Sequence, residues 1–161
     1  MSQKQPVSLM YRLMKKLNPL VANNYQKRIG PGRAILLLTT TGRKSSLPRV
    51  TPLQFEEVDG EYYIGSARGA EADWYRNILA NQEVEVQIQE HCFHGIAEPV
   101  CDPGRVADFL ALRAKRRPLF IGLLMRLEGL PWRYNRLDLE RFAAQKTLVI
   151  IRKQSVTASI E

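Results

Sequence analysis

The chain contains few of the residues that cross-link a protein or bind metals. It has two cysteines, Cys92 and Cys101, and two histidines among its 161 residues. A domain of this length buries enough apolar surface to fold without disulfides, so the low cysteine count favours a reducing compartment. No segment is apolar for long enough to cross a bilayer, and neither an internal repeat nor a low-complexity block occurs. These absences exclude a disulfide scaffold, a membrane-spanning protein and a repeat protein, and they favour one ordinary domain.

The few cysteines and histidines do gather in one region, at His91, Cys92, His94 and Cys101. On a strand, Cys92 and His94 would share a face while His91 points away. A zinc site needs a second close pair of ligands, and no such pair stands elsewhere with the spacing of a zinc site. We therefore predict no metal centre. A hydrolase of the Ser-His-Asp type also lacks support, because no nucleophile elbow appears in the sequence.

Positive charge is in excess. Lys and Arg outnumber Asp and Glu by 24 to 16, which gives a formal net charge of +8. Nucleic acid, an acidic membrane face or a phosphorylated cofactor would each suit such a balance. The basic run over residues 113–117 falls on an expected helix, and no recognised nucleic-acid module surrounds it. We predict that this run is a solvated helix face, with an anionic or membrane contact as the alternative, and we expect no nucleic-acid partner.

The N-terminal region is predicted to form an amphipathic helix over about residues 7–24. Its apolar residues recur at three- and four-residue spacing, at Val7, Met10, Met14, Leu17 and Val21. This face would pack on the domain core or lie on an anionic membrane surface, and both interpretations stay open. Lys15, Lys16 and Asn18 interrupt any run of signal-peptide type, so we expect a cytoplasmic protein, with peripheral contact at the inner membrane face left open.

Hydrophobic alternation predicts a mainly antiparallel fold. Val84, Val86 and Ile88 alternate with polar residues, and Asp59-Gly60 is typical of a tight hairpin. Strands are expected at 34–41, 49–58, 61–67, 84–89, 93–100 and 147–151, and helices at 72–80, 103–117, 119–127 and 137–144. Because the first three strands follow one another without a helix, we predict an α+β fold built on a small antiparallel barrel. One domain is expected over 1–153, with a flexible tail over 154–161.

A polar loop between the first two expected strands concentrates cations. The sequence from residue 34 to 53 reads AILLLTTTGRKSSLPRVTPL. Gly42 would let the backbone turn, and Arg43, Lys44 and Arg49 offer charged donors that suit a phosphate. An ordinary solvated hairpin tip carries the same residue types. Spacing alone therefore leaves the anion cradle and the hairpin tip both open.

This loop and the later segment GSARGAEADWYRNILAN together resemble the deazaflavin-dependent nitroreductase family. The resemblance covers about residues 34–100, with both motifs in the expected order. It implies the split β-barrel that is shared with FMN-dependent pyridoxamine-phosphate oxidases, often as a dimer, and the deazaflavin coenzyme F420. It also implies hydride transfer from reduced F420 to a small electron-poor acceptor such as a quinone or a nitro compound. The alternatives are an FMN-binding reductase of the same fold and a non-catalytic carrier of cofactor or lipid.

The resemblance also implies which residues form the cofactor site. These are Thr41, Gly42, Arg43, Lys44, Ser45 and Arg49 at the phosphate loop, Thr51, Pro52 and Leu53 at the ring, and Ser66, Ala67, Arg68, Gly69, Trp74 and Asn77 beyond it. The sequence departs from the family pattern at two places. Ser46 stands where the family usually has Gly after the loop Ser, and no Pro precedes Trp74. Without the resemblance, Trp74 would be a core aromatic and Asn77 an exposed polar residue. Tyr134, in an aromatic-rich turn, is the candidate catalytic residue that would face the substrate or donate a proton.

Overall fold

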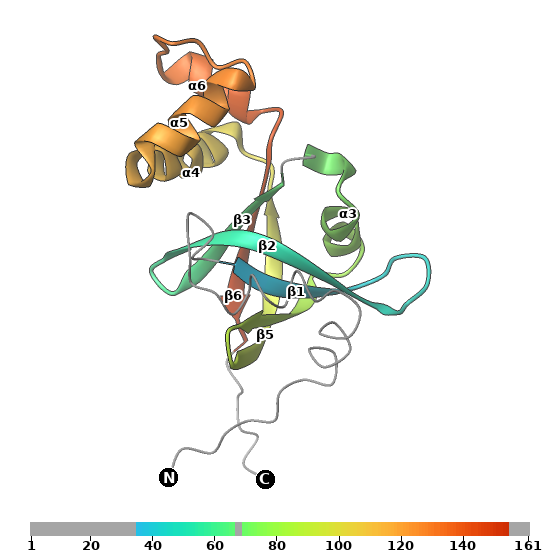
Figure 1. Ribbon diagram of the computed structural model, residues 1–161. Coiled ribbons are helices and arrows are strands. Elements are labelled where there is room, and N and C mark those ends of the chain that lie inside the picture. Colours follow the sequence, from blue (N-terminus) through green and yellow to red (C-terminus); the bar gives the residue numbers. More distant parts are fainter. Residues whose placement is uncertain (1–34, 67–68, 155–161) are drawn as a thin grey trace.

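The computed structural model describes residues 35–66 and 69–154, and within them six strands close into a barrel (Figure 1). The strands are β1 (Ile35–Thr41), β2 (Pro48–Val58), β3 (Glu61–Ser66), β4 (Glu83–Ile88), β5 (His91–Val100) and β6 (Thr147–Lys153). The helices are η1 (Gly69–Glu71), α3 (Asp73–Ala80), α4 (Pro103–Arg116), α5 (Pro118–Leu127) and α6 (Arg136–Ala143). Each expected strand and helix in these ranges is confirmed. The expected helix over residues 7–24 and the tail after residue 154 lie outside the described residues.

The barrel is antiparallel throughout, and two of its ladders, β1 with β4 and β2 with β3, are short. Its strand order is β1-β2-β3-β6-β5-β4, and β4 pairs back onto β1, so the predicted α+β antiparallel barrel is confirmed. The ladder between β2 and β3 covers only Phe55–Val58 against Glu61–Ile64. Before Phe55, β2 pairs with β1, whereas Gly65 and Ser66 of β3 pair with β6. Beyond this ladder β2 and β3 diverge, so the part of β2 before Phe55 has no partner on the β3 side.

Two apolar clusters share strand β6. Val149 and Ile151 point into the barrel, where they pack with residues such as Ile64. Leu148 and Ile150 point the other way, against α4, α5 and α6, which we call the helical unit. Figure 1 shows this unit grouped at one end of the barrel. A strand that is buried on both faces explains why Thr147–Ile151 is almost continuously apolar and β-branched.

A buried carboxylate ties the helical unit to the barrel. Glu56 of β2 is only 6% exposed, and the Nη1 of Arg116 lies 2.9 Å from its Oε2. Arg113 and Arg117 approach its other oxygen at 3.8 and 3.7 Å. The prediction of a solvated face over residues 113–117 is therefore wrong for Arg113 and Arg117, whose side chains are 20% and 25% exposed.

In the ranges that the structure describes, no helix is long and apolar enough to span a membrane.

Candidate functional site

The β1–β2 loop needs a glycine at position 42 for space. The Gly42 N–H donates to the Leu47 carbonyl at 2.8 Å, and the Ser46 N–H donates to the Gly42 carbonyl at 2.7 Å. A Cβ on Gly42 would lie 2.7 Å from the Oγ of Ser45 and 3.0 Å from the Leu47 carbonyl oxygen. The left-handed residue of the loop is instead Ser46, with a φ of 56°. Close packing at Gly42, rather than the backbone freedom that we expected there, therefore requires the glycine.

Arg43 holds this loop against helix α3. Its guanidinium donates to Asn77 Oδ1 at 3.0 Å and to Asp73 Oδ1 at 2.9 Å, and its backbone N–H reaches Asn77 Oδ1 at 3.2 Å. Asn77 is 3% exposed, and its Nδ2 donates to Thr40 Oγ1 at 3.1 Å. The interpretation of Asn77 as an exposed polar residue is therefore wrong. Its amide anchors the loop, and Arg43 is engaged by protein groups.

Two further cations of the loop face solvent. Lys44 and Arg49 are both exposed. Among the described residues, the Arg49 guanidinium reaches the Oγ of Ser45 alone, at 3.4 Å, and Lys44 has no ion pair. The nearby first turn of α3 has no side-chain cap, because its N-cap is Ala72. Uncapped N–H groups and exposed cations are the donors that an anionic ligand group requires.

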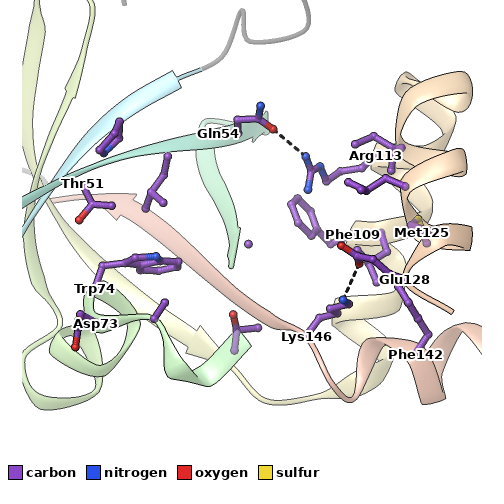
Figure 2. A pocket seen from close by; sticks show the side chains of 18 residues that line it. Thr51, Gln54, Asp73, Trp74, Phe109, Arg113, Met125, Glu128, Phe142 and Lys146 are labelled. Atoms are coloured by element: carbon purple, nitrogen blue, oxygen red, sulfur yellow. Dashed lines mark hydrogen bonds and ion pairs between the residues drawn. The ribbon is translucent and has the colours of Figure 1, made fainter. Parts of the chain in front are cut away.

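A cavity of about 570 Å³ lies where β2 and β3 diverge, between the barrel and the helical unit (Figure 2). Thr51, Pro52 and Leu53 line it from β2, and Trp74 lines it from α3. These four predicted site residues are thus brought together. Thr51 follows Arg49 by two residues on one strand, a rise of about 7 Å, so the cavity adjoins the cationic loop.

The barrel side of the cavity is an open strand edge. From Pro48 to Gln54, β2 has a ladder with β1 but none with β3. Alternate backbone groups along this edge therefore face the opening. Proline is tolerated at such an edge because no ladder bond there needs its missing N–H, which fits Pro52. Gly65 of β3 forms the adjacent wall without a side chain.

The helical side combines apolar and charged groups. Phe109, Ile121 and Met125 supply apolar wall, and Arg113 and Lys146 bring two cations. Figure 2 shows Arg113 bonded to Gln54, at 3.4 Å, and Lys146 paired with Glu128, at 2.7 Å. Burial lowers the pKa of Arg113 from its usual range, against the opposing charge of Glu56.

Two buried polar atoms at this cavity have no hydrogen-bond partner. They are the Nε of Arg113 and the Oγ1 of Thr147. Buried polar groups are almost always paired, so an orphaned atom beside a cavity calls for an explanation. For Thr147 a polar ligand group in the cavity would supply it, whereas the Nε of Arg113 faces Glu56 Oε1 at 3.8 Å.

Tyr134 lies apart from this arrangement. It is 38% exposed and is not among the residues that line the cavity. The guanidinium of Arg126 sits 5.9 Å from its ring and 5.1 Å from that of Trp132.

The Ser66 side chain, Ala67 and Arg68 lie outside what the structure describes, and Gly69 begins η1. Over the described ranges, no three His, Cys, Asp or Glu side chains gather as a metal site would need.

The sequence did not indicate the helical wall of the cavity. Phe109 and Arg113 of α4, and likewise Lys146 and Thr147 where β6 begins, all follow the two motifs in the sequence. Their spacing is that of ordinary amphipathic elements. The sequence indicated a buried position for Arg113 only weakly. A cation beside apolar residues on a helix can be half-buried, but the same pattern also occurs on solvated faces.

Comparisons with known proteins agree with the two motifs. The family model for F420H(2)-dependent quinone reductase matches residues 12–119. An F420H(2)-dependent quinone reductase of Mycobacterium tuberculosis is 38% identical over 68 residues, which are 40% of this chain and 46% of that protein. The chain thus spans less than half the length of the curated relatives it matches.

Solved structures support the fold. An F420-H2 dependent reductase, FDR-A, superposes with a TM-score of 0.50 at 24% identity, over 74% of this chain and 95% of its own. A structure described as a domain-swapped dimer gives 0.51 at 20% identity, over 90% of this chain and 100% of its own. The split-barrel architecture is thereby confirmed, and since the family model covers two thirds of the chain, the chain belongs to the F420H(2)-dependent quinone reductase family.

Proposed function

We propose that the protein is an oxidoreductase that transfers a hydride from reduced F420 to an electron-poor acceptor, with a quinone as the first candidate. One observation carries the proposal: the cavity at the open edge of β2 begins at Thr51, two residues from Arg49 in the exposed cationic β1–β2 loop. Its volume of about 570 Å³ is in the range of small-molecule sites. An open backbone edge, apolar walls and a cationic end suit a planar ring that carries a phosphate and carboxylates.

The chain's residues would then have separate tasks. Lys44, Arg49 and the uncapped start of α3 would bind the anionic part of the cofactor. The β2 edge over residues 51–54 would orient the ring, and Trp74 and Phe109 would exclude water from it. F420, when bound in its reduced form, supplies the hydride. The protein contributes mainly proximity and electrostatic placement, which need no acid or base close to the reacting atoms.

The cavity favours an apolar acceptor. Ile121, Leu124 and Met125 of α5 line the side opposite the barrel. An electron-poor ring with an apolar body, such as a quinone, suits that wall better than a charged acceptor does. Tyr134 stays a prediction as proton donor. Unchanged turnover in Tyr134→Phe would remove that role.

The first test is a titration of the full chain with F420 and, separately, with FMN, followed by fluorescence. We expect F420 to bind and FMN not to bind, and the loaded protein to reduce a water-soluble quinone. Binding of FMN alone would move the protein to the flavin branch of this fold. Binding without turnover would favour the carrier alternative, and binding of neither compound would overturn the proposed site.

Loop cations provide the second test. Lys44→Ala or Arg49→Ala should weaken F420 binding by about 1 kcal/mol or more, the scale of a lost charge-assisted hydrogen bond. Arg141→Ala is the matched control, because Arg141 is exposed on α6, outside the cavity lining. Wild-type affinity in both loop variants would contradict the phosphate-site assignment.

A methyl group at Gly65 provides the third test. A Cβ there would lie 3.5 Å from the Thr147 carbonyl oxygen and 3.6 Å from Phe109 Cε1, which are ordinary contact distances. Gly65→Ala should therefore fold with unchanged thermal stability. It should weaken F420 binding about tenfold, because the methyl group takes up space at the cavity wall. Unchanged affinity would place the ring elsewhere.

We also propose a cytoplasmic homodimer. One protein of similar fold is described as a domain-swapped dimer. No disulfide joins Cys92 and Cys101, both of which lie in the described part of the chain, as is usual in a reducing compartment. Light scattering at twice the chain mass would support the dimer. The membrane contact of the helix predicted over residues 7–24 stays a prediction.

A further inference from the structure

Helix α5 presents an apolar face to solvent. Leu119, Phe120, Leu123 and Leu127 are 88%, 52%, 52% and 76% exposed, and Leu124 is 40% exposed. At 3.6 residues per turn these five side chains occupy a continuous arc of roughly 140°. The opposite side of the helix, with Ile121 and Met125, is buried. Large side chains gathered on one exposed face mark an interaction surface, whereas scattered ones do not.

Cations and an aromatic residue flank this face in the sequence, and Lys115, Arg116 and Arg133 are the exposed cations among them. Between residues 113 and 135 the sequence has six Lys or Arg and one acidic residue, Glu128. Glu128 is paired with Lys146. Glu56 neutralises only one of the three positive charges of Arg113, Arg116 and Arg117, which precede α5. Trp132 follows the helix, is 76% exposed, and stacks on Arg126. Leucine and phenylalanine on one side, with tryptophan and cations at the margin, are typical of helices that lie in the membrane interface.

We propose that the face of α5 formed by Leu119, Phe120, Leu123 and Leu127 docks on an anionic lipid bilayer, with Trp132 and the bordering cations at headgroup level. Charge complementarity selects this occupant. A second copy would bring the same patch against itself around a two-fold axis, so the bordering cations would face one another. An anionic bilayer neutralises them instead. The proposed homodimer would accordingly use another surface.

The docked position would bring the cavity close to the lipid. Leu124 is partly exposed beside the apolar face, and it lines the cavity together with Ile121 and Met125. One helix thus separates the bilayer from the proposed acceptor site. The family match ends at residue 119, so the remainder of α5 lies outside the segment that the comparison covers.

Vesicle binding of the full chain tests the proposal. We would measure co-flotation with phosphatidylcholine vesicles that contain one third phosphatidylglycerol, and with pure phosphatidylcholine vesicles as the neutral comparison. Binding should require the anionic lipid and weaken with salt. Leu123→Gln/Leu127→Gln should weaken it at least about tenfold, because each leucine loses its apolar burial. The matched control is Leu79→Gln, since Leu79 is 57% exposed on α3, and it should bind as the wild type does.

Tryptophan fluorescence locates the contact. Trp132 is 76% exposed and Trp74 is 7% exposed, so a blue shift on adding anionic vesicles should come from Trp132. The shift should persist in Trp74→Phe and vanish in Trp132→Phe, while the latter still floats. Absence of wild-type binding would overturn the proposal. Binding that the double leucine variant leaves intact would also overturn it, and would point to the region of residues 7–24.

A third outcome would identify a different occupant. If the double leucine variant converts a dimer into a monomer and the wild type ignores vesicles, the face binds a second copy and the lipid proposal is wrong. None of these measurements uses a cofactor or an acceptor. Their failure would therefore leave the proposed reductase function untouched, and loss of F420 binding would leave the lipid proposal untouched.

Discussion

At the scale of single residues, Ser46 carries a conformational cost that glycine would avoid. Its φ of 56° is in the left-handed region, which is unfavourable for residues with a Cβ by about 1–2 kcal/mol. We expect Ser46→Gly to raise the free energy of unfolding by up to about 1 kcal/mol, because the flexible unfolded chain offsets part of the gain. Urea unfolding measures this. Ser45→Gly is the control in the same loop, and a Ser46→Gly variant less stable than wild type would contradict the argument.

Asn77 is the residue whose loss should disturb the loop most. Removal of its amide leaves Thr40 Oγ1 and the Arg43 N–H without their buried partner. Asn77→Ala should therefore lower the free energy of unfolding by about 2 kcal/mol. Asn77→Asp keeps the oxygen that accepts from Arg43, so we expect a smaller loss in urea unfolding at neutral pH. Equal losses in the two variants would show that the Arg43 contact contributes little.

At the scale of elements, Glu56 should anchor α4 to the barrel. Its carboxylate faces three arginines at the end of that helix. Glu56→Gln removes the negative charge and leaves the half-buried cations to repel one another, so we expect about 2 kcal/mol less stability. Glu57→Gln is the matched control, because Glu57 is exposed and only its carbonyl is contacted by Arg116. Thermal unfolding measures the loss of stability. If Glu56→Gln loses no more stability than Glu57→Gln does, Glu56 does not anchor α4.

The elements themselves could be predicted from local patterns. The sequence of strand β4 alternates polar and apolar residues, and Asp102 forms the expected N-cap of α4, with its side chain accepting from the Gly104 N–H. Such signals depend on neighbours a few residues apart. The antiparallel character of the barrel also followed, because consecutive strands without helices favour antiparallel pairing.

Long-range contacts could not be predicted in this way. Arg43 meets Asn77 across 34 positions, and Arg116 meets Glu56 across 60. No local periodicity encodes which polar residue finds which partner. The resemblance placed Thr51, Pro52, Leu53 and Trp74 at the site, and all four line the cavity. The helical wall was missed because its residues have the spacing of an ordinary packed helix.

At the scale of the whole molecule, β6 makes one cooperative unit of two apolar clusters. Val149 and Ile151 belong to the barrel cluster, and Leu148 and Ile150 belong to the helical cluster. Neither cluster can lose this strand without exposing the other. The cavity lies between these clusters, so its shape depends on their staying together. The same coupling would let lipid contact at α5 act on the cavity wall, since Met125 belongs to the helical cluster.

Single-tryptophan variants can test this coupling. Trp132→Phe leaves Trp74 to report on the barrel, and Trp74→Phe leaves Trp132 to report on the helical unit. If β6 couples the clusters, fluorescence and far-ultraviolet circular dichroism should give the same urea midpoint within each variant. Leu148→Ala, added to either background, should lower the free energy of unfolding by about 3 kcal/mol, the usual loss for a buried leucine, and both signals should report the same loss. An early transition of Trp132 alone would mean that the helical unit unfolds independently, and the cavity would then be a contact between two separately stable parts.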